Sequence, residues 1–78
     1  MKENEVLEKV QDIFRDVLDN DEIELTNEMR ADDIEEYDSL AHIQLVVAIE
    51  KEFNIKFNSS EIVSWKNIGD MVRCISSK

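Results

Sequence analysis

The chain has 78 residues, which is enough for one domain and too few for two. Nineteen acidic side chains against nine basic ones give a formal net charge of -10, so the surface repels nucleic acid and anionic membranes. A single cysteine excludes an internal disulfide, and no group of cysteine and histidine residues has the spacing of a metal site.

The acidic surface favours protein partners that present lysine and arginine, although solubility alone would also explain it. Self-repulsion at this charge predicts that salt stabilises the fold. We expect a cytoplasmic monomer, because no basic start is followed by an apolar run and no stretch is long and apolar enough to cross a bilayer.

Apolar residues recur every three or four positions, and the chain has no proline and one glycine. This pattern predicts an all-α fold. The first helix is expected over residues 3–18, with one apolar stripe made of Val6, Leu7, Val10, Phe14, Val17 and Leu18.

Residues 19–38 contain too few apolar side chains for a long amphipathic helix, and they predict a long ordered loop with at most a short turn near Asp32 to Glu35. Loops of this length in small domains are often functional. The acidic start of the loop resembles a calcium site. That interpretation fails because Ile23, Glu24 and Arg30 occupy the positions of a ligand, the turn glycine and the bidentate glutamate.

The second helix is expected from Ser39 to Phe53, with Asp38 as the N-cap that accepts hydrogen bonds from first-turn amides. Two further pairs, a polar cap and an acidic residue three positions later, begin at Asn58 and at Asn67. These caps predict short helices over residues 59–64 and 68–76. The expected fold is a small four-helix bundle with three longer helices, one short helix and the long loop between the first two.

The second helix carries two apolar stripes. One is expected to face the core and consists of Leu45, Val46, Ile49 and Phe53. The other adjoins Ser39 and Glu50 and consists of Leu40, Ile43 and Val47. This second stripe is either buried between neighbouring helices or a docking patch for a partner, with apolar anchors for affinity and carboxylates for orientation.

Few residues could support catalysis. His42 lies three residues after Ser39, but so small a chain cannot build a deep pocket around a serine–histidine pair, so an ordinary helix-face histidine is the preferred interpretation. Cys74 is expected to be a half-buried filler with no activating base or cation nearby. Ser39 lies where free amides and the helix dipole favour an attached phosphate, although it could also be a second cap.

Four segments follow one another at a characteristic spacing: Asp38-Ser39-Leu40, the helix from Ile43 to Phe53, Ile55-Lys56-Phe57, and the late segment from Asn67 to Val72. In their order and spacing the chain resembles the acyl carrier proteins. The resemblance spans nearly the whole chain, which implies one carrier domain over residues 1–78.

The resemblance implies a carrier that is not itself an enzyme. A phosphopantetheinyl transferase would use coenzyme A and magnesium to attach 4'-phosphopantetheine to Ser39, beside Asp38 and Leu40, and the arm would hold acyl groups as thioesters. Partner enzymes that load and transfer acyl groups would meet the partner-binding residues Leu40, Ile43, Val47 and Glu50. The bundle interior could shelter cargo among Phe14, Leu45, Ile49, Phe53, Ile62 and Ile75.

Several residues depart from the fatty-acid carriers. Glu36 and Tyr37 replace a glycine and a small residue before the Asp-Ser-Leu tripeptide, and the second helix has fewer acids, with Ala41, Gln44 and Lys51. We therefore favour a dedicated biosynthetic pathway over general fatty-acid synthesis, with polyketide or other acyl transfer included. An aminoacyl or D-alanyl carrier, and an interaction module that keeps the fold without the arm, are the alternatives.

Overall fold

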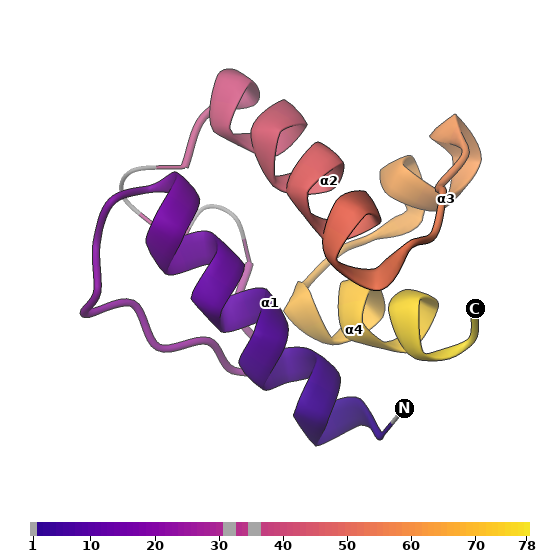
Figure 1. The fold of residues 1–78 in the computed structure, drawn as a ribbon, viewed down its shortest axis with the longest axis horizontal. Coiled ribbons are helices and arrows are strands. Elements are labelled where there is room, and N and C mark those ends of the chain that lie inside the picture. Colours follow the sequence, from indigo (N-terminus) through magenta and orange to yellow (C-terminus); the bar gives the residue numbers. More distant parts are fainter. Residues whose placement is uncertain (1, 31–32, 35–36) are drawn as a thin grey trace.

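The computed structural model describes residues 2–30, 33–34 and 37–78, and this part of the chain folds into helices without strands. The helices are α1 (Glu3–Val17), α2 (Ser39–Phe53), α3 (Ser59–Ser64) and α4 (Ile68–Ser76), shown in Figure 1. The predicted all-α bundle is confirmed, and α1 ends one residue earlier than expected. The short turn expected near Asp32 to Glu35 has both ends outside the described residues.

Helix α1 buries one face, because Val6, Val10 and Phe14 follow at intervals of four residues. The helix stops at Asp19, whose φ of 52° is left-handed. The next amide, that of Asn20, donates to the Arg15 carbonyl at 2.9 Å and so closes the last turn. The acidic start of the loop is therefore part of a helix terminus.

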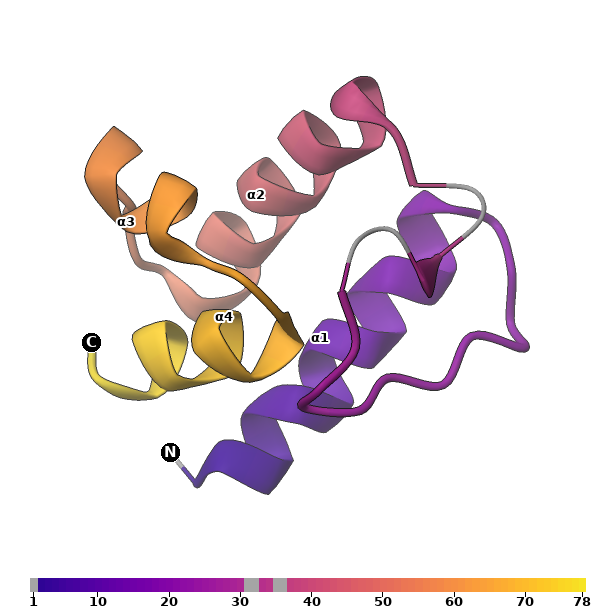
Figure 2. The same ribbon diagram turned by 180° about the vertical axis from the view of Figure 1, so that it is seen from behind.

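The long loop is tied to two helices. Its backbone bonds α1 through the Leu25 amide, which donates to the Gln11 side chain at 2.8 Å, and through a carbonyl that accepts from Arg15. Farther along, the carbonyls of Asn27 and Met29 each accept a first-turn amide of α4 at 2.8 Å. Figure 2 shows this loop passing along α1 to the start of α4. Groups on α1 and α4 therefore satisfy backbone groups of the described part of the loop.

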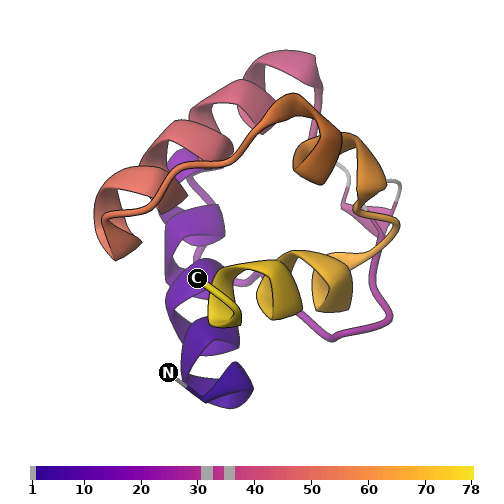
Figure 3. The ribbon, with the colours of Figure 1, turned by 90° about the vertical axis from the view of Figure 1, so that its right-hand side faces the viewer.

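The core lies where α1, α2 and α4 meet, and α3 sits at its rim (Figure 3). Three apolar side chains of the loop, Ile23, Leu25 and Ile34, also enter this core. The helices supply the remaining buried apolar residues, which are Val6, Val10, Phe14, Ala41, Leu45, Ile49, Ile68, Met71, Val72 and Ile75. None of the helices in the described part of the chain is long and apolar enough to cross a membrane.

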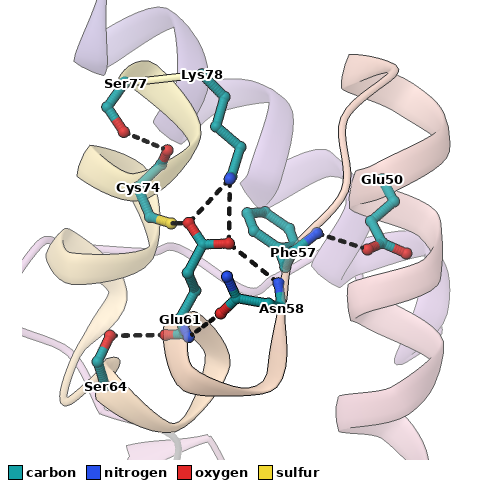
Figure 4. A network of polar contacts seen from close by, with 8 residues as sticks. All are labelled: Glu50, Phe57, Asn58, Glu61, Ser64, Cys74, Ser77 and Lys78. Atoms are coloured by element: carbon teal, nitrogen blue, oxygen red, sulfur yellow. Dashed lines mark hydrogen bonds and ion pairs between the residues drawn. The ribbon is translucent and has the colours of Figure 1, made fainter.

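Helix α3 is short and buries none of its residues, so polar contacts hold it in place. Asn58 and Glu61 form a complete capping box, in which each side chain accepts the other's backbone amide. The Glu61 carboxylate also pairs with Lys78 at 2.8 Å and accepts from the Cys74 thiol at 3.6 Å (Figure 4). One carboxylate therefore links α3 to α4 and to the residues that follow it.

Cys74 is half-buried, as expected, and its thiol is not activated, although it donates to the Glu61 carboxylate, a contact that the sequence did not indicate. Burial is the main cause that raises the pKa of its thiol. The nearby Glu61 carboxylate raises that pKa further. The thiol therefore stays protonated at neutral pH and is a poor nucleophile.

Candidate functional site

Ser39 is the first residue of α2, and its side chain is exposed. Asp38 forms the N-cap with extended backbone, and its Oδ1 accepts the Ala41 amide at 2.8 Å, as predicted. Ser39 is therefore not needed as a cap. By helix geometry the amides of Ser39 and Leu40 precede the first intrahelical hydrogen bond, so they are available to a phosphate on the serine.

A surface hollow of about 440 Å³ lies beside the serine and is lined by Tyr37, Asp38, Ser39, His42 and Ile43. Its space and the exposed hydroxyl fit an attached arm. The Tyr37 hydroxyl contacts Nδ1 of His42, and the two rings meet edge to face. Burial raises the pKa of Tyr37 to about 12, so its hydroxyl stays protonated and can donate to Nδ1 in the tautomer whose proton is on Nε2.

This contact also bears on the serine–histidine pair. The described hydrogen bonds place Nδ1 of His42 against Tyr37 and include none between His42 and Ser39. A serine nucleophile needs a base within hydrogen-bond reach. The arrangement thus supports the interpretation of His42 as an ordinary helix-face histidine. Ser39 has no activating base in the described part of the chain.

The outer stripe of α2 is exposed, not buried. Leu40 is 64% exposed, Ile43 60% and Val47 44%. The inner stripe is confirmed for Leu45 and Ile49, which are fully buried, and for Phe53, which packs against the core. Val46 is half-buried and lies outside the described core cluster. The exposed apolar row leads away from Ser39 along α2, which favours the docking interpretation of the two that the sequence allowed.

Glu50 has a structural contact that the sequence did not indicate. Its Oε2 accepts the Phe57 amide at 2.9 Å and so ties the end of α2 to the segment before α3 (Figure 4). The carboxylate is half-buried. Of the four residues expected to meet partners, Leu40, Ile43 and Val47 have exposed side chains. Glu50 also holds the segment between α2 and α3 through its bond to the Phe57 amide.

A second cavity of about 110 Å³, called the inner cavity below, has Tyr37 and His42 in its lining as the hollow does, and it is partly open to solvent. Of the six residues expected to shelter cargo, only Phe14 and Ile62 line it. The others pack in the core or beside it. Sequence patterns did not predict a cavity lined by Trp65, Lys66, Asn67, Ile68 and Met71. Only the bulk of Tyr37 before the serine marked that position as unusual.

Comparison with known proteins accounts for this geometry. Residues 8–75 match the family model described as the phosphopantetheine attachment site. An acyl carrier protein of Petrotoga mobilis is 33% identical over 78 residues, covering 100% of this chain and 92% of that protein. The chain belongs to the acyl carrier protein family. The acyl carrier protein of Clostridium acetobutylicum is 36% identical over 72 residues, covering 92% of this chain and 94% of that protein.

A solved acyl carrier protein has the same fold. The solution NMR structure of a holo acyl carrier protein from Geobacter metallireducens matches with a TM-score of 0.88 and 41% identity, over 94% of this chain and 84% of that chain. The resemblance seen in the sequence is confirmed, and with it the carrier function and the covalent phosphopantetheine cofactor. Acyl carrier proteins deliver acyl groups to enzymes of acyl metabolism and are not enzymes themselves.

Proposed function

We propose that Ser39 carries the phosphopantetheine arm and that residues 1–78 act as one carrier domain. The supporting observation is the exposed hydroxyl of Ser39 at the first position of a capped fifteen-residue helix, beside a hollow that can hold the start of the arm. Asp38 stabilises the helix start, and the adjacent Leu40 lies where it can contact the arm. When bound, the group supplies the thiol that holds an acyl cargo as a thioester.

Loading requires an external enzyme, because the described part of the chain shows no base hydrogen-bonded to the Ser39 hydroxyl that could remove its proton. The Ser39 oxygen attacks the pyrophosphate of coenzyme A next to the pantetheine, in a phosphopantetheinyl transferase that binds magnesium. A new phosphate ester forms, the pyrophosphate bond breaks, and adenosine 3',5'-bisphosphate leaves. The hydroxyl proton passes to a base of the transferase. The helix amides then donate to the ester phosphate.

The proposed partner surface is the exposed row of Leu40, Ile43 and Val47, with Glu50 at its end. The first turn of α2 contains no acidic residue, and Glu50 is engaged by the Phe57 amide. Partner enzymes that rely on a basic patch would therefore find few carboxylates here. Apolar contact should dominate affinity, so partner binding is expected to weaken little with added salt.

This surface supports a dedicated biosynthetic pathway over general fatty-acid synthesis. Gln44 occupies the exposed side of α2 and Lys51 its last turn, so the face differs in charge from the acidic one that a common set of basic enzymes would select. Acyl cargo is the proposal. Aminoacyl cargo, including D-alanyl, remains the alternative, and trapping the loaded thioester from cells and identifying it by mass spectrometry would decide between them.

Intact-mass spectrometry tests the attachment site. The chain, incubated with coenzyme A, magnesium and a broad-specificity transferase, should gain one phosphopantetheine, and Ser39→Ala should gain none. Ser59→Ala is the matched control, because Ser59 is also an exposed first residue of a helix with an asparagine cap. Its loading should equal that of the unchanged chain.

Loading of Ser39→Ala at an unchanged level would place the arm elsewhere and contradict the assignment. No loading of the unchanged chain, under conditions that load another carrier protein, would instead favour an interaction module without an arm. Because Asp38 caps the helix by itself, Ser39→Ala should keep its circular dichroism spectrum and its melting temperature. A lost arm would then reflect chemistry and not unfolding.

A further inference from the structure

His42 lies beside the serine that is proposed to carry the arm. It follows Ser39 by three positions on α2, a spacing that places two side chains on one face of a helix. Ser39, His42 and Tyr37 also line the same hollow. The Tyr37 hydroxyl contacts Nδ1 of His42, and the two rings meet edge to face with 5.8 Å between centroids. The structure thus fixes an imidazole next to the place where the arm begins.

The contact with Tyr37 decides which ring nitrogen of His42 carries the proton. The Tyr37 hydroxyl has no second hydrogen-bond partner in the described part of the chain, so its proton needs Nδ1 as its acceptor. The neutral imidazole then has its own proton on Nε2. Within the described residues Nε2 has no hydrogen-bond partner. One N–H donor of His42 is therefore unused.

A phosphate ester on Ser39 is an acceptor that suits this donor. The ester carries one negative charge, and hydrogen bonds to charged acceptors are shorter and stronger than those between neutral groups. Among the described lining residues of the hollow, His42 is the only one whose side chain offers an N–H group. The Asp38 carboxylate in the same lining repels a phosphate, although its Oδ1 already accepts the Ala41 amide. His42 is therefore the side chain of the hollow that attracts the phosphate.

We propose that the Nε2–H group of His42 donates to the phosphate of the arm on Ser39, and that Tyr37 is the positioning residue that keeps the proton on Nε2. This proposal rests on the proposed attachment of the arm to Ser39. Ile43 lines the hollow and also belongs to the exposed row of α2. A phosphate held by His42 therefore starts the arm alongside the row on which partner enzymes are proposed to dock.

Three substitutions separate the donor from the ring. His42→Leu removes the donor, whereas His42→Gln is the matched rescue, because its amide nitrogen can donate from about the place of Nε2. Tyr37→Phe keeps the stacking on Phe14, at 6.0 Å between centroids, but frees the imidazole to exchange between its two tautomers. Loss of one hydrogen bond shifts the equilibrium between a held and a free phosphate by about two- to tenfold. His42→Leu should show this full loss, Tyr37→Phe a smaller one, and His42→Gln little.

NMR spectroscopy of the loaded chain reads both ends of the contact. His42 is the single histidine, so its ring signals identify themselves. At about pH 8.5, where an ordinary imidazole is neutral, the nitrogen-15 shifts of the unloaded chain should place the proton on Nε2. Loading with the arm should then shift the Nε2–H signal and slow its exchange with water. The phosphorus-31 signal of the arm should relax as part of the protein in the unchanged chain and in His42→Gln, and as a mobile group in His42→Leu.

Two results would overturn the proposal. One is an Nε2–H signal that loading leaves unchanged, and the other is a phosphorus signal that changes equally in His42→Gln and His42→Leu or in neither. If circular dichroism shows His42→Leu to be misfolded, the imidazole signals of the unchanged chain before and after loading still decide. Intact mass is measured first. Absence of the arm from Ser39 would overturn the proposed function, whereas an arm whose phosphate does not respond to His42 overturns this proposal alone.

Discussion

Gly69 lies in the first turn of α4 at the point where the long loop comes closest to that helix. Its amide donates to the Asn27 carbonyl at 2.8 Å. A Cβ at this position would lie 2.9 Å from the same carbonyl oxygen and 3.2 Å from the Asn27 Cβ. Only glycine lets the backbone of the loop and that of the helix come this close.

Gly69→Ala should therefore destabilise the protein by about 1–3 kcal/mol, the usual effect of forcing extra atoms into a packed site. Helix propensity alone predicts the opposite sign, a gain of about 1 kcal/mol. Urea unfolding measures the difference. A stabilised Gly69→Ala variant would show that the loop can move away from α4 without loss.

The contacts of single residues show where the sequence was informative. The role of Asp38 was predictable because a cap acts on amides a few positions away. The contact of Tyr37 with His42 was not, because it depends on the path of the loop before α2. The exposure of Leu40 and Val47 was left open for the same reason, since it depends on where α3 packs.

At the scale of the elements, local sequence patterns predicted the bounds of the helices but not the inner cavity. Apolar periodicity and the caps at Asp38, Asn58 and Asn67 placed α2, α3 and α4 to the residue. The inner cavity draws its walls from α1, α2, the α3–α4 region and the loop, so only tertiary packing defines it. Sequence patterns therefore indicated Ser39, the proposed attachment residue, but not most of the residues that line the inner cavity.

Helix α3 depends on the charge of Glu61. The hydrogen bond from Lys78 and then the Asn58 amide lower the pKa of this carboxyl below 4.5. A lowered pKa in the folded state means that the stabilisation is present above the unfolded value and is lost as pH falls through the folded value. The capping box and the link to Lys78 should fail together on acidification.

We expect the helical NMR chemical shifts of α3 to be lost at a higher pH than those of α1 during an acid titration. In Glu61→Gln, the side chain can still accept the Asn58 amide but carries no charge for Lys78. This acid transition of α3 should therefore disappear in the variant. If the helical shifts of α1 and α3 are instead lost together as the pH falls, Glu61 does not stabilise α3 independently of α1.

For the molecule as a whole, the negative charge is divided unequally. Residues 1–38 contain fifteen acidic and four basic side chains, whereas residues 39–78 contain four acidic and five basic side chains. The first part forms α1 and the loop, which run together in Figure 2, and the second forms α2 to α4. Self-repulsion is therefore concentrated in α1 and the loop, and the helix that begins with Ser39 belongs to the nearly neutral part.

Salt should raise the melting temperature, because it screens this repulsion within a Debye length of about 8–10 Å. Thr26→Lys places a cation on an exposed site in the acidic part, and Ser60→Lys places the same cation on an exposed site of α3. At low salt the melting temperature of Thr26→Lys should rise by roughly 2–4 °C more than that of Ser60→Lys. This difference corresponds to about 0.5 kcal/mol of unfolding free energy in a domain of this size. Scanning calorimetry at several salt concentrations measures this, and a melting temperature indifferent to salt would contradict it.

Helix α3 buries none of its residues, yet Ile62 on it and Trp65 just after it line the inner cavity. Substitutions at these two positions would reshape the cavity while the core among α1, α2 and α4 stays intact. The cavity and the core are thus only partly built from the same residues, since Phe14, Ile68 and Met71 belong to both and Ile62 and Trp65 do not belong to the buried core. Related carriers could therefore differ in the shape of this cavity through a few substitutions around α3 and keep the proposed attachment serine and the proposed docking helix unchanged.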